Sequence, residues 1–305
     1  MKTYRNPTKT NSHWPDWYRE QNLKQANHPE SETAKGPPSS SESTSGIRDG
    51  NDYFNENGQY LYTDCGGKNE IRIIDSTTFD QITALHSQTY GPNGICLADD
   101  VTELDKYLYA ASRNLTATDF REGPGDHLLG GIGRYYLRKE GKSDIPVGMG
   151  SSMGSAAFTT IEENRRIVNV STNFGDLTDS NLAWNKYQMI NTLIHEAGHF
   201  ERHYEVAKNA EGEDTYQSRG TDASVPGGSG RHLEAYWDQV NHWSWQRVDR
   251  ESQEYDLQVI AMHIAYLSLE DRAKATDWVH KFEEKCGIVF RKMTSRKTEN
   301  VIEWK

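Results

Sequence analysis

The residues best suited to chemistry in this chain form the run His195-Glu196-Ala197-Gly198-His199. Two histidines four positions apart lie on one face of a helix, one turn from each other. Their imidazoles can therefore converge on one zinc ion, at about 2.0–2.1 Å from it. Glu196 points to the metal-bound water rather than to the metal, so it can take a proton from that water and pass it to a leaving group. The run predicts a catalytic Zn²⁺ site with His195 and His199 as ligands and Glu196 as the general base.

A catalytic zinc needs a third protein ligand and an open position. His232 is the preferred candidate, because it opens a new helical pattern in which the small Ala235 would let that helix press close to the metal helix. Glu254 and Glu234 stay open as alternatives. An acid at Glu254 is already explained by the helix dipole, since it lies in the first turn of the next predicted helix. Gly198 has no Cβ, so it would also let another backbone approach the motif closely.

Aromatic residues gather just after His232, at Tyr236, Trp237, Trp243 and Trp245. Burial preferences predict that these side chains form a core beneath the metal helix. The alternative is that they line the substrate site. Tyr236 lies one turn after His232, so its hydroxyl could donate to a developing oxyanion.

The motif must be presented by a helix, and hydrophobic periodicity predicts one over residues 184–204. Ile190, Ile194, Ala197 and Phe200 recur near the helical period and predict its buried stripe. A β-branched, alternating run predicts a strand over 165–172 just before it. The pattern also predicts a loop over 208–230, helices from about 231 to 242, 250 to 269 and 272 to 285, and a solvated basic tail over 291–305.

Earlier in the chain, residues 1–46 predict a flexible arm and linker, which ends in the run Gly-Pro-Pro-Ser-Ser-Ser-Glu-Ser-Thr-Ser-Gly at 36–46. Residues 47–305 are then one catalytic domain, with a small β lead-in over 47–76. Asn57-Gly58 predicts a hairpin turn, followed by strands over 59–63 and 71–74. A helix is predicted over 102–111, and the glycine-rich stretch 123–154 carries no predicted element. Together the patterns predict an α+β fold that is mainly helical, with a small β-sheet beside the motif helix.

Composition excludes several classes of protein. The formal net charge of −11 argues against nucleic acid as a partner, because phosphate binding needs clustered Lys and Arg. No apolar stretch approaches the length of a membrane span, and no Sec signal peptide is visible at the N-terminus. Three cysteines allow one disulfide at most, and none lies in a C-x-x-C pair.

The motif helix resembles that of the zincin metallopeptidases over residues 187–204. In that superfamily the two histidines bind zinc and the glutamate is the general base, so the resemblance gives those roles to His195, His199 and Glu196 and implies a zincin-like fold. The downstream run His232-x-x-Ala235-Tyr236-x-x-Gln239 is similar to the Glu-x-x-Ala helix that supplies the third ligand in many zincins, with His in place of Glu. The elongated motif of the metzincins is absent.

Residues 52–64 resemble a segment found ahead of the toxin domains of bacterial polymorphic and Rhs-type toxins. That resemblance implies an antibacterial effector that is secreted or delivered into a rival cell without a Sec signal, and that is cytoplasmic before export. It also implies a cognate immunity protein and a secretion-system carrier as partners.

The leading functional hypothesis is therefore a zinc metallopeptidase that hydrolyses bonds in a protein or peptide substrate. Such an endopeptidase needs a sheet edge that pairs with the substrate backbone, for which residues 165–172 are the candidate. The alternatives are a zinc amidase acting on cell-wall peptides and a non-catalytic binding module with a structural zinc. A closed site with four protein ligands would indicate the module, and Glu196 argues against it, because a structural site has no use for a base.

Overall fold

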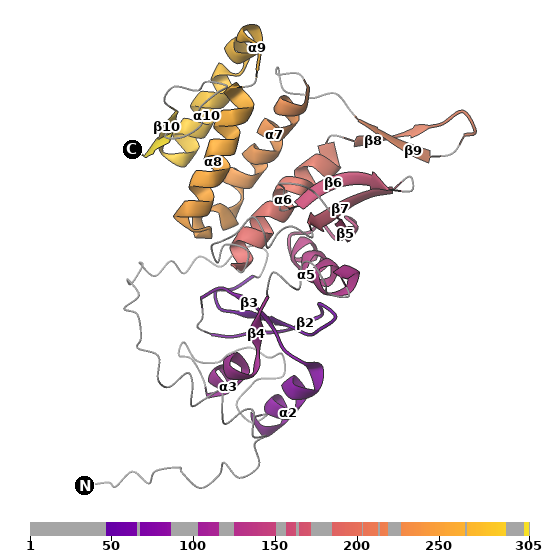
Figure 1. The fold of residues 1–305 in the computed structure, drawn as a ribbon, viewed down its shortest axis with the longest axis vertical. Helices are drawn as coiled ribbons and strands as arrows, with labels where there is room; N and C mark the ends of the chain where they lie inside the picture. The colour runs from indigo at the N-terminus through magenta and orange to yellow at the C-terminus, as the bar shows by residue number, and fades with distance from the viewer. Residues whose placement is uncertain are drawn as a thin grey trace.

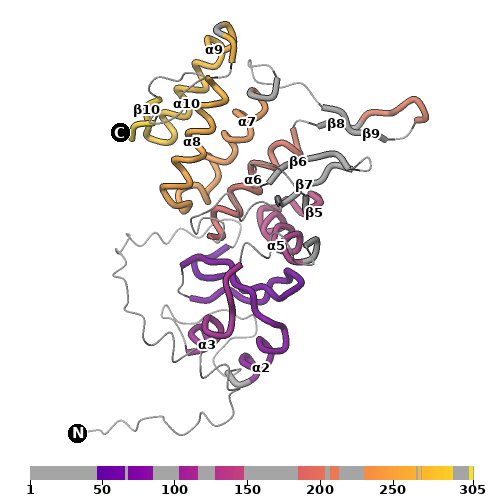
Figure 2. Tube along the Cα trace, in the orientation of Figure 1, coloured from indigo at the N-terminus to yellow at the C-terminus, as the bar shows by residue number. Residues whose placement is uncertain are grey.

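The computed structural model describes most of the chain from residue 47 onward. The described ranges are 47–65, 68–86, 103–115, 125–150, 157–162, 165–171, 185–202, 204–212, 214–218, 227–265, 267–290 and 302–304. The arm and linker predicted over 1–46 lie outside them. Within these ranges the chain combines helices with four small sheets, which confirms the α+β class (Figure 1). The same course is traced as a tube in Figure 2.

The first part of the chain forms a four-stranded sheet with two helices, drawn at the bottom of Figure 1. In spatial order its strands are β2 (Tyr60–Thr63), β1 (Asp52–Phe54), β3 (Ile71–Ile73) and β4 (Arg113–Asn114), and the helices are α2 (Ser76–His86) and α3 (Glu103–Ala111). β1 and β2 are antiparallel, and Gly58 in their connection has φ of +72°, which a glycine adopts without strain. The predicted hairpin and the helix predicted over 102–111 are confirmed. Cys65, just after β2, takes part in a disulfide, whereas Cys286 is a free thiol.

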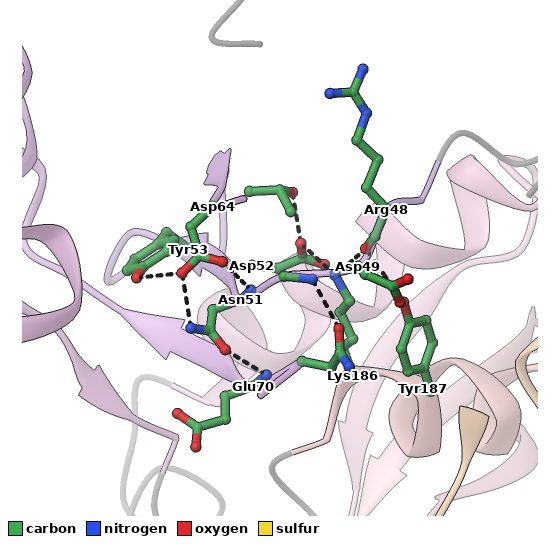
Figure 3. A network of polar contacts seen from close by, with 12 residues as sticks. Arg48, Asp49, Asn51, Asp52, Tyr53, Asp64, Glu70, Lys186 and Tyr187 are labelled. Carbon is green, nitrogen blue, oxygen red and sulfur yellow. Dashed lines mark hydrogen bonds and ion pairs between the residues drawn. The ribbon is translucent and has the colours of Figure 1, made fainter. Parts of the chain in front are cut away.

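A buried ion pair joins this sheet to the start of the motif helix (Figure 3). The carboxylate of Asp52 accepts three hydrogen bonds, from Thr63 Oγ1 (2.7 Å), Tyr136 OH (2.9 Å) and Lys186 Nζ (3.1 Å). Lys186 Nζ also donates to the backbone oxygen of Arg48. Lys186 is 0% exposed and Asp52 is 1% exposed. Charges this deeply buried are tolerated only when they are paired and hydrogen-bonded, as they are here.

A second polar cluster closes the loops of the same sheet (Figure 3). The Asp64 carboxylate accepts hydrogen bonds from the backbone and the side-chain amide of Asn51, at 2.6 and 2.8 Å, and from Tyr53 OH at 3.1 Å. Asn51 Oδ1 in turn accepts from the backbone nitrogens of Lys68 and Glu70. Burial raises the pKa of Asp64 to about 6. These hydrogen bonds hold the loops of the lead-in together, whereas the Asp52–Lys186 pair ties the lead-in to the motif helix.

The glycine-rich stretch forms a helix, α5 (Gly125–Lys139), where the sequence predicted no element. Its glycines are used for close packing. A Cβ on Gly131 would lie 2.7 Å from the backbone oxygen of Gly58, and one on Gly133 would lie 2.8 Å from Val147 Cγ1. Apolar side chains of the same helix enter the core, namely Leu128, Leu129, Ile132 and Tyr136. Glycine frequency predicts a loop when the neighbours that require the glycines are unknown.

Three strands form a sheet beside the motif helix, as expected (Figure 1). They are β5 (Val147–Gly150), β6 (Ala157–Glu162) and β7 (Arg165–Ser171), in the order β5-β7-β6. The strand predicted over 165–172 is confirmed as β7, but its predicted role as a sheet edge is wrong. β7 is the central strand, because its residues 168–171 pair in parallel with β5 and its residues 165–170 pair antiparallel with β6, so both of its hydrogen-bonding edges are paired from 168 to 170.

The motif helix is α6 (Lys186–Arg202), close to the range predicted for it. Its first turn is capped by Asn185, whose side-chain oxygen accepts a hydrogen bond from the backbone nitrogen of Tyr187 at 2.8 Å. The predicted stripe is buried, with Ile190, Ile194, Ala197 and Phe200 between 0% and 8% exposed. These side chains share one hydrophobic core with α5 and the first sheet. The helix therefore packs its buried face against the elements that precede it.

Helices dominate the rest of the chain, as predicted. They are α7 (Gly227–Asn241), the 3₁₀ helix η3 (Trp243–Arg247), α8 (Arg250–Ala265), α9 (Leu269–Lys274) and α10 (Thr276–Cys286). α7, α8 and α10 enclose a second core that includes Leu233, Leu257 and Phe282. Trp245 is buried, Trp237 packs against this second core, and Trp243 packs against the first one, so the prediction of a core is confirmed for the three tryptophans.

Two predictions for polar segments are wrong in part. The predicted loop over 208–230 begins within a hairpin, β8 (Tyr204–Lys208) and β9 (Asp214–Ser218), which projects to the right in Figure 1. The predicted solvated tail contains β11 (Ile302–Trp304), which pairs with β10 (Ile288–Phe290). Composition indicates loops at both places, and strand pairing overrides it, between neighbouring strands in the hairpin and with the more distant β10 in the tail.

Candidate metal centre

Three histidines from two helices converge. His195 and His199 extend from α6 and His232 from α7, and one ring nitrogen of each lies within 4.8 Å of the others. The Nε2 atoms of His195 and His199 are 3.1 Å apart. Two nitrogens bound to one tetrahedral zinc at 2.0–2.1 Å would be about 3.4 Å apart, so this pair is spaced to share an ion. In the described part of the chain, this is the one group of three or more His, Cys, Asp or Glu side chains with such geometry.

The donor set fits zinc. Imidazole nitrogens suit Zn²⁺ as well as copper, iron and nickel, whereas calcium and magnesium prefer oxygen. Catalytic zinc sites have three protein ligands, whereas structural zinc sites have four. The three histidines, with an acid beside one of them, match the catalytic kind.

Small residues let α6 and α7 approach each other at the site. A Cβ on Gly198 would lie 3.5 Å from the Cα of Ala235, which is an ordinary contact. The same Cβ would lie 2.8 Å from Asp238 Oδ2, which forms an ion pair with Arg202. The expected close approach at Ala235 is therefore confirmed, but the tight neighbour of Gly198 is a side chain and not a backbone.

The other candidate ligands lie outside this group. Glu254 accepts hydrogen bonds from Arg250 Nε at 3.1 Å and from Trp304 Nε1 at 2.8 Å. Glu234 is buried on α7 and is not part of the three-histidine group. Of the three candidates, His232 is the one that the fold brings to His195 and His199.

Glu196 and Tyr236 supply an acid and a phenol beside the histidines. Glu196 is 6% exposed and follows His195 directly on α6. The ring of Tyr236 lies 4.3 Å from the His195 ring, centroid to centroid, at 68°. Burial, together with the negative charges of Asp256 and Glu196, raises the pKa of Tyr236 well above its usual range. Tyr236 therefore keeps its proton and can act as a hydrogen-bond donor.

His263 of α8 is a neighbour of the site that the sequence did not indicate. Its ring stacks on that of His232, with centroids 4.3 Å apart and the planes at 22°. Burial lowers the pKa of His263, so the ring is neutral at physiological pH and does not repel a cation. A lone histidine in a predicted helix gives no signal of this contact.

A polar chain lies behind His195. Its Nδ1 is 3.0 Å from Gln239 Oε1, and Gln239 Nε2 donates to Asp256 Oδ2 at 2.6 Å. Asn191 Nδ2 donates to the backbone oxygen of Gln239 and to Ser244 Oγ, both at 3.0 Å. Burial raises the pKa of Asp256 to about 7, although the hydrogen bond from Gln239 opposes the shift. Gln239 belongs to the run in which the resemblance was recognised, but its role there was not predicted.

No family model, curated protein or solved structure matches this chain. The zincin assignment therefore stays a prediction from the motif and from the geometry around it. No helix in the part of the chain that the structure describes is long and apolar enough to cross a membrane.

Proposed function

We propose that this protein is a zinc-dependent hydrolase of the zincin type that cleaves peptide bonds. The observation that carries the proposal is the convergence of His195, His199 and His232 from two helices within 4.8 Å, beside the acid Glu196. A bound zinc supplies Lewis acidity, which lowers the pKa of water toward about 7 and polarises a carbonyl.

The remaining chemistry belongs to side chains of this protein. The Glu196 carboxylate takes a proton from the attacking water as the oxygen bonds to the carbonyl carbon. It then gives that proton to the amide nitrogen as the carbon–nitrogen bond breaks. The Tyr236 hydroxyl donates a hydrogen bond to the negative charge that develops on the carbonyl oxygen. Because these groups are largely screened from water, each such interaction is stronger than it would be in solvent.

Delivery into a rival cell stays a prediction, because it depends on the resemblance of residues 52–64 alone. The same holds for the immunity protein and for the secretion-system carrier. A zinc amidase for cell-wall peptides would use the same residues, so the substrate test below separates the two activities.

Metal content is the first test. The purified protein is analysed for bound metals beside His195→Ala, His232→Ala and Glu254→Ala, the last as a matched control from outside the histidine group. We expect one zinc per wild-type chain, little in the two histidine variants and an unchanged content in the control. A wild type that contains no zinc and takes up none on addition would overturn the proposal. Loss of zinc from Glu254→Ala with retention in His232→Ala would overturn the ligand assignment.

Turnover is the second test. Labelled casein and purified cell-wall peptides are incubated with wild type, with Glu196→Gln and with wild type treated with a chelator. We expect casein to be cut by wild type alone, and Glu196→Gln to keep its fold and its zinc. Activity in Glu196→Gln would refute the mechanism. Cleavage of the cell-wall peptides with casein intact would establish the amidase, and zinc binding without either activity would favour the binding module.

A further inference from the structure

We propose that Gln239 and Asp256 form a positioning relay that fixes the tautomer of His195, with the hydrogen on Nδ1 and the lone pair on the Nε2 that would bind the metal. The inference deepens the proposed function and rests on it for the metal. The tautomer itself can be measured without any metal.

The three groups are buried and follow one another at hydrogen-bond distance. His195 is 7% exposed, Gln239 2% and Asp256 7%. Gln239 Oε1 lies 3.0 Å from His195 Nδ1, and Gln239 Nε2 lies 2.6 Å from Asp256 Oδ2. The groups come from α6, α7 and α8, so the relay crosses three helices.

The order of donors and acceptors along the relay has one solution when Asp256 is ionised. A carboxylate only accepts hydrogen bonds, so it must face the NH₂ of Gln239. The amide oxygen of Gln239 then faces His195, and since it also only accepts, Nδ1 of His195 must carry the hydrogen. A neutral imidazole has one N–H, so Nε2 keeps its lone pair. Nε2 is the atom that lies 3.1 Å from His199 Nε2, on the side of the proposed ion.

A second contact holds Gln239 in place. Its backbone oxygen accepts a hydrogen bond at 3.0 Å from Asn191 Nδ2, which also donates to Ser244 Oγ. Asn191 is one turn before His195 on α6 and is 0% exposed. α6 is therefore fixed to the backbone of α7 at the residue whose side chain orients the histidine.

The relay differs from ordinary core hydrogen bonding in that its direction can be reversed or restored by substitutions of equal size. Asp256→Asn lets the Gln239 amide flip, because Asn can donate as well as accept. Gln239→Glu brings two carboxyl groups into contact. The double variant Gln239→Glu, Asp256→Asn restores the order, since Glu accepts from His195 and Asn donates to Glu. A packing role alone would not be rescued by combining the two changes.

The tautomer is tested first, on the metal-free full chain at pH 8.5, where Asp256 is ionised. Long-range proton–nitrogen correlation spectra distinguish the two forms of a neutral imidazole. We expect His195 to carry its hydrogen on Nδ1 in wild type and in the double variant, with the Nε2–H form appearing in Asp256→Asn. A wild-type His195 with its hydrogen on Nε2 would overturn the proposal, and this result needs no variant that might fail to fold.

Zinc affinity is measured next, by competition with a chelating dye. We expect each single variant to bind zinc about 10–100-fold more weakly, the range typical for loss of a partner that orients a ligand. The double variant should recover to within a few-fold of wild type, and Asn241→Asp, which adds a carboxylate at the exposed end of α7, should match wild type. A double variant no tighter than the weaker single would overturn the relay. If wild-type His195 carries its hydrogen on Nδ1 but the protein binds no zinc, the proposed function is refuted, whereas the relay is still supported.

Discussion

Replacing Lys186 with methionine keeps a side chain of similar length but removes the ammonium that binds Asp52. The Nζ–Oδ1 distance is 3.1 Å, and both residues are buried. At an effective dielectric constant of about 20, the attraction at this distance is about 5 kcal/mol. Breaking a buried pair on one side costs about 3–5 kcal/mol, because the remaining charge stays buried. Asp52 keeps two hydroxyl donors, so we expect a loss near the lower limit, about 3 kcal/mol in the free energy of unfolding.

Urea unfolding of the metal-free protein measures this loss. The series is Lys186→Met, Asp52→Asn and the double variant, which removes both charges and should recover part of the stability. Lys142→Met is the matched control, because Lys142 pairs with Glu201 on the surface, where both side chains are partly exposed. An exposed pair is worth less than about 1 kcal/mol. Equal losses for Lys186→Met and Lys142→Met would refute the view that the first sheet is anchored electrostatically to α6.

Two further predictions concern the pH dependence of stability and the glycines. The pKa of Asp256 is raised from 3.8 to about 7, so between these values the folded state holds a proton that the unfolded state has released. The free energy of unfolding therefore falls as pH rises through this window, by up to about 4 kcal/mol from this group. Unfolding curves at pH 5 and pH 8 should show a smaller fall for Asp256→Asn than for wild type. An equal fall in the two proteins would contradict the raised pKa of Asp256. Gly198→Ala should lie within about 1 kcal/mol of wild type, because the gain in helix propensity offsets the disturbed Asp238 pair. Gly131→Ala should lower the free energy of unfolding by about 1–3 kcal/mol, because its Cβ meets backbone atoms of Asn57 and Gly58. Thermal unfolding measures both variants, and equal losses for Gly198→Ala and Gly131→Ala would refute this reasoning.

Local chemistry explains why much of the site could be predicted. The spacing of His195 and His199 requires only a helix, and the preference for His232 needed only the beginning of a second helix and the small Ala235. The relay could not be predicted in this way. Gln239 and Asp256 acquire their roles only when α8 packs on α7, and amide and carboxylate side chains on a helix are ordinary surface residues until that packing is known.

The fold shows the same division. Periodic apolar residues predicted α3, α6 and the C-terminal helices, because each of these helices buries a stripe of its own residues. α5 was missed because its glycines reflect contacts outside the helix, with Gly58 far before it in the sequence and with Val147 on the next strand. β7 was predicted as a strand but not as a central one, since the position of a strand in a sheet depends on its partners.

Two of the histidines, His199 and His232, also close a loop in the chain. His199 and His232 are 33 positions apart in the sequence, and hairpin β8–β9 lies between them. The entropy of closing a flexible loop depends only on the logarithm of its length, so doubling the loop changes the closure free energy by about 0.6 kcal/mol. Extra residues in the turn of this hairpin, next to Gly212, should therefore leave the spacing of the histidines unchanged. This turn is a suitable position for an inserted peptide tag or for a grafted recognition segment.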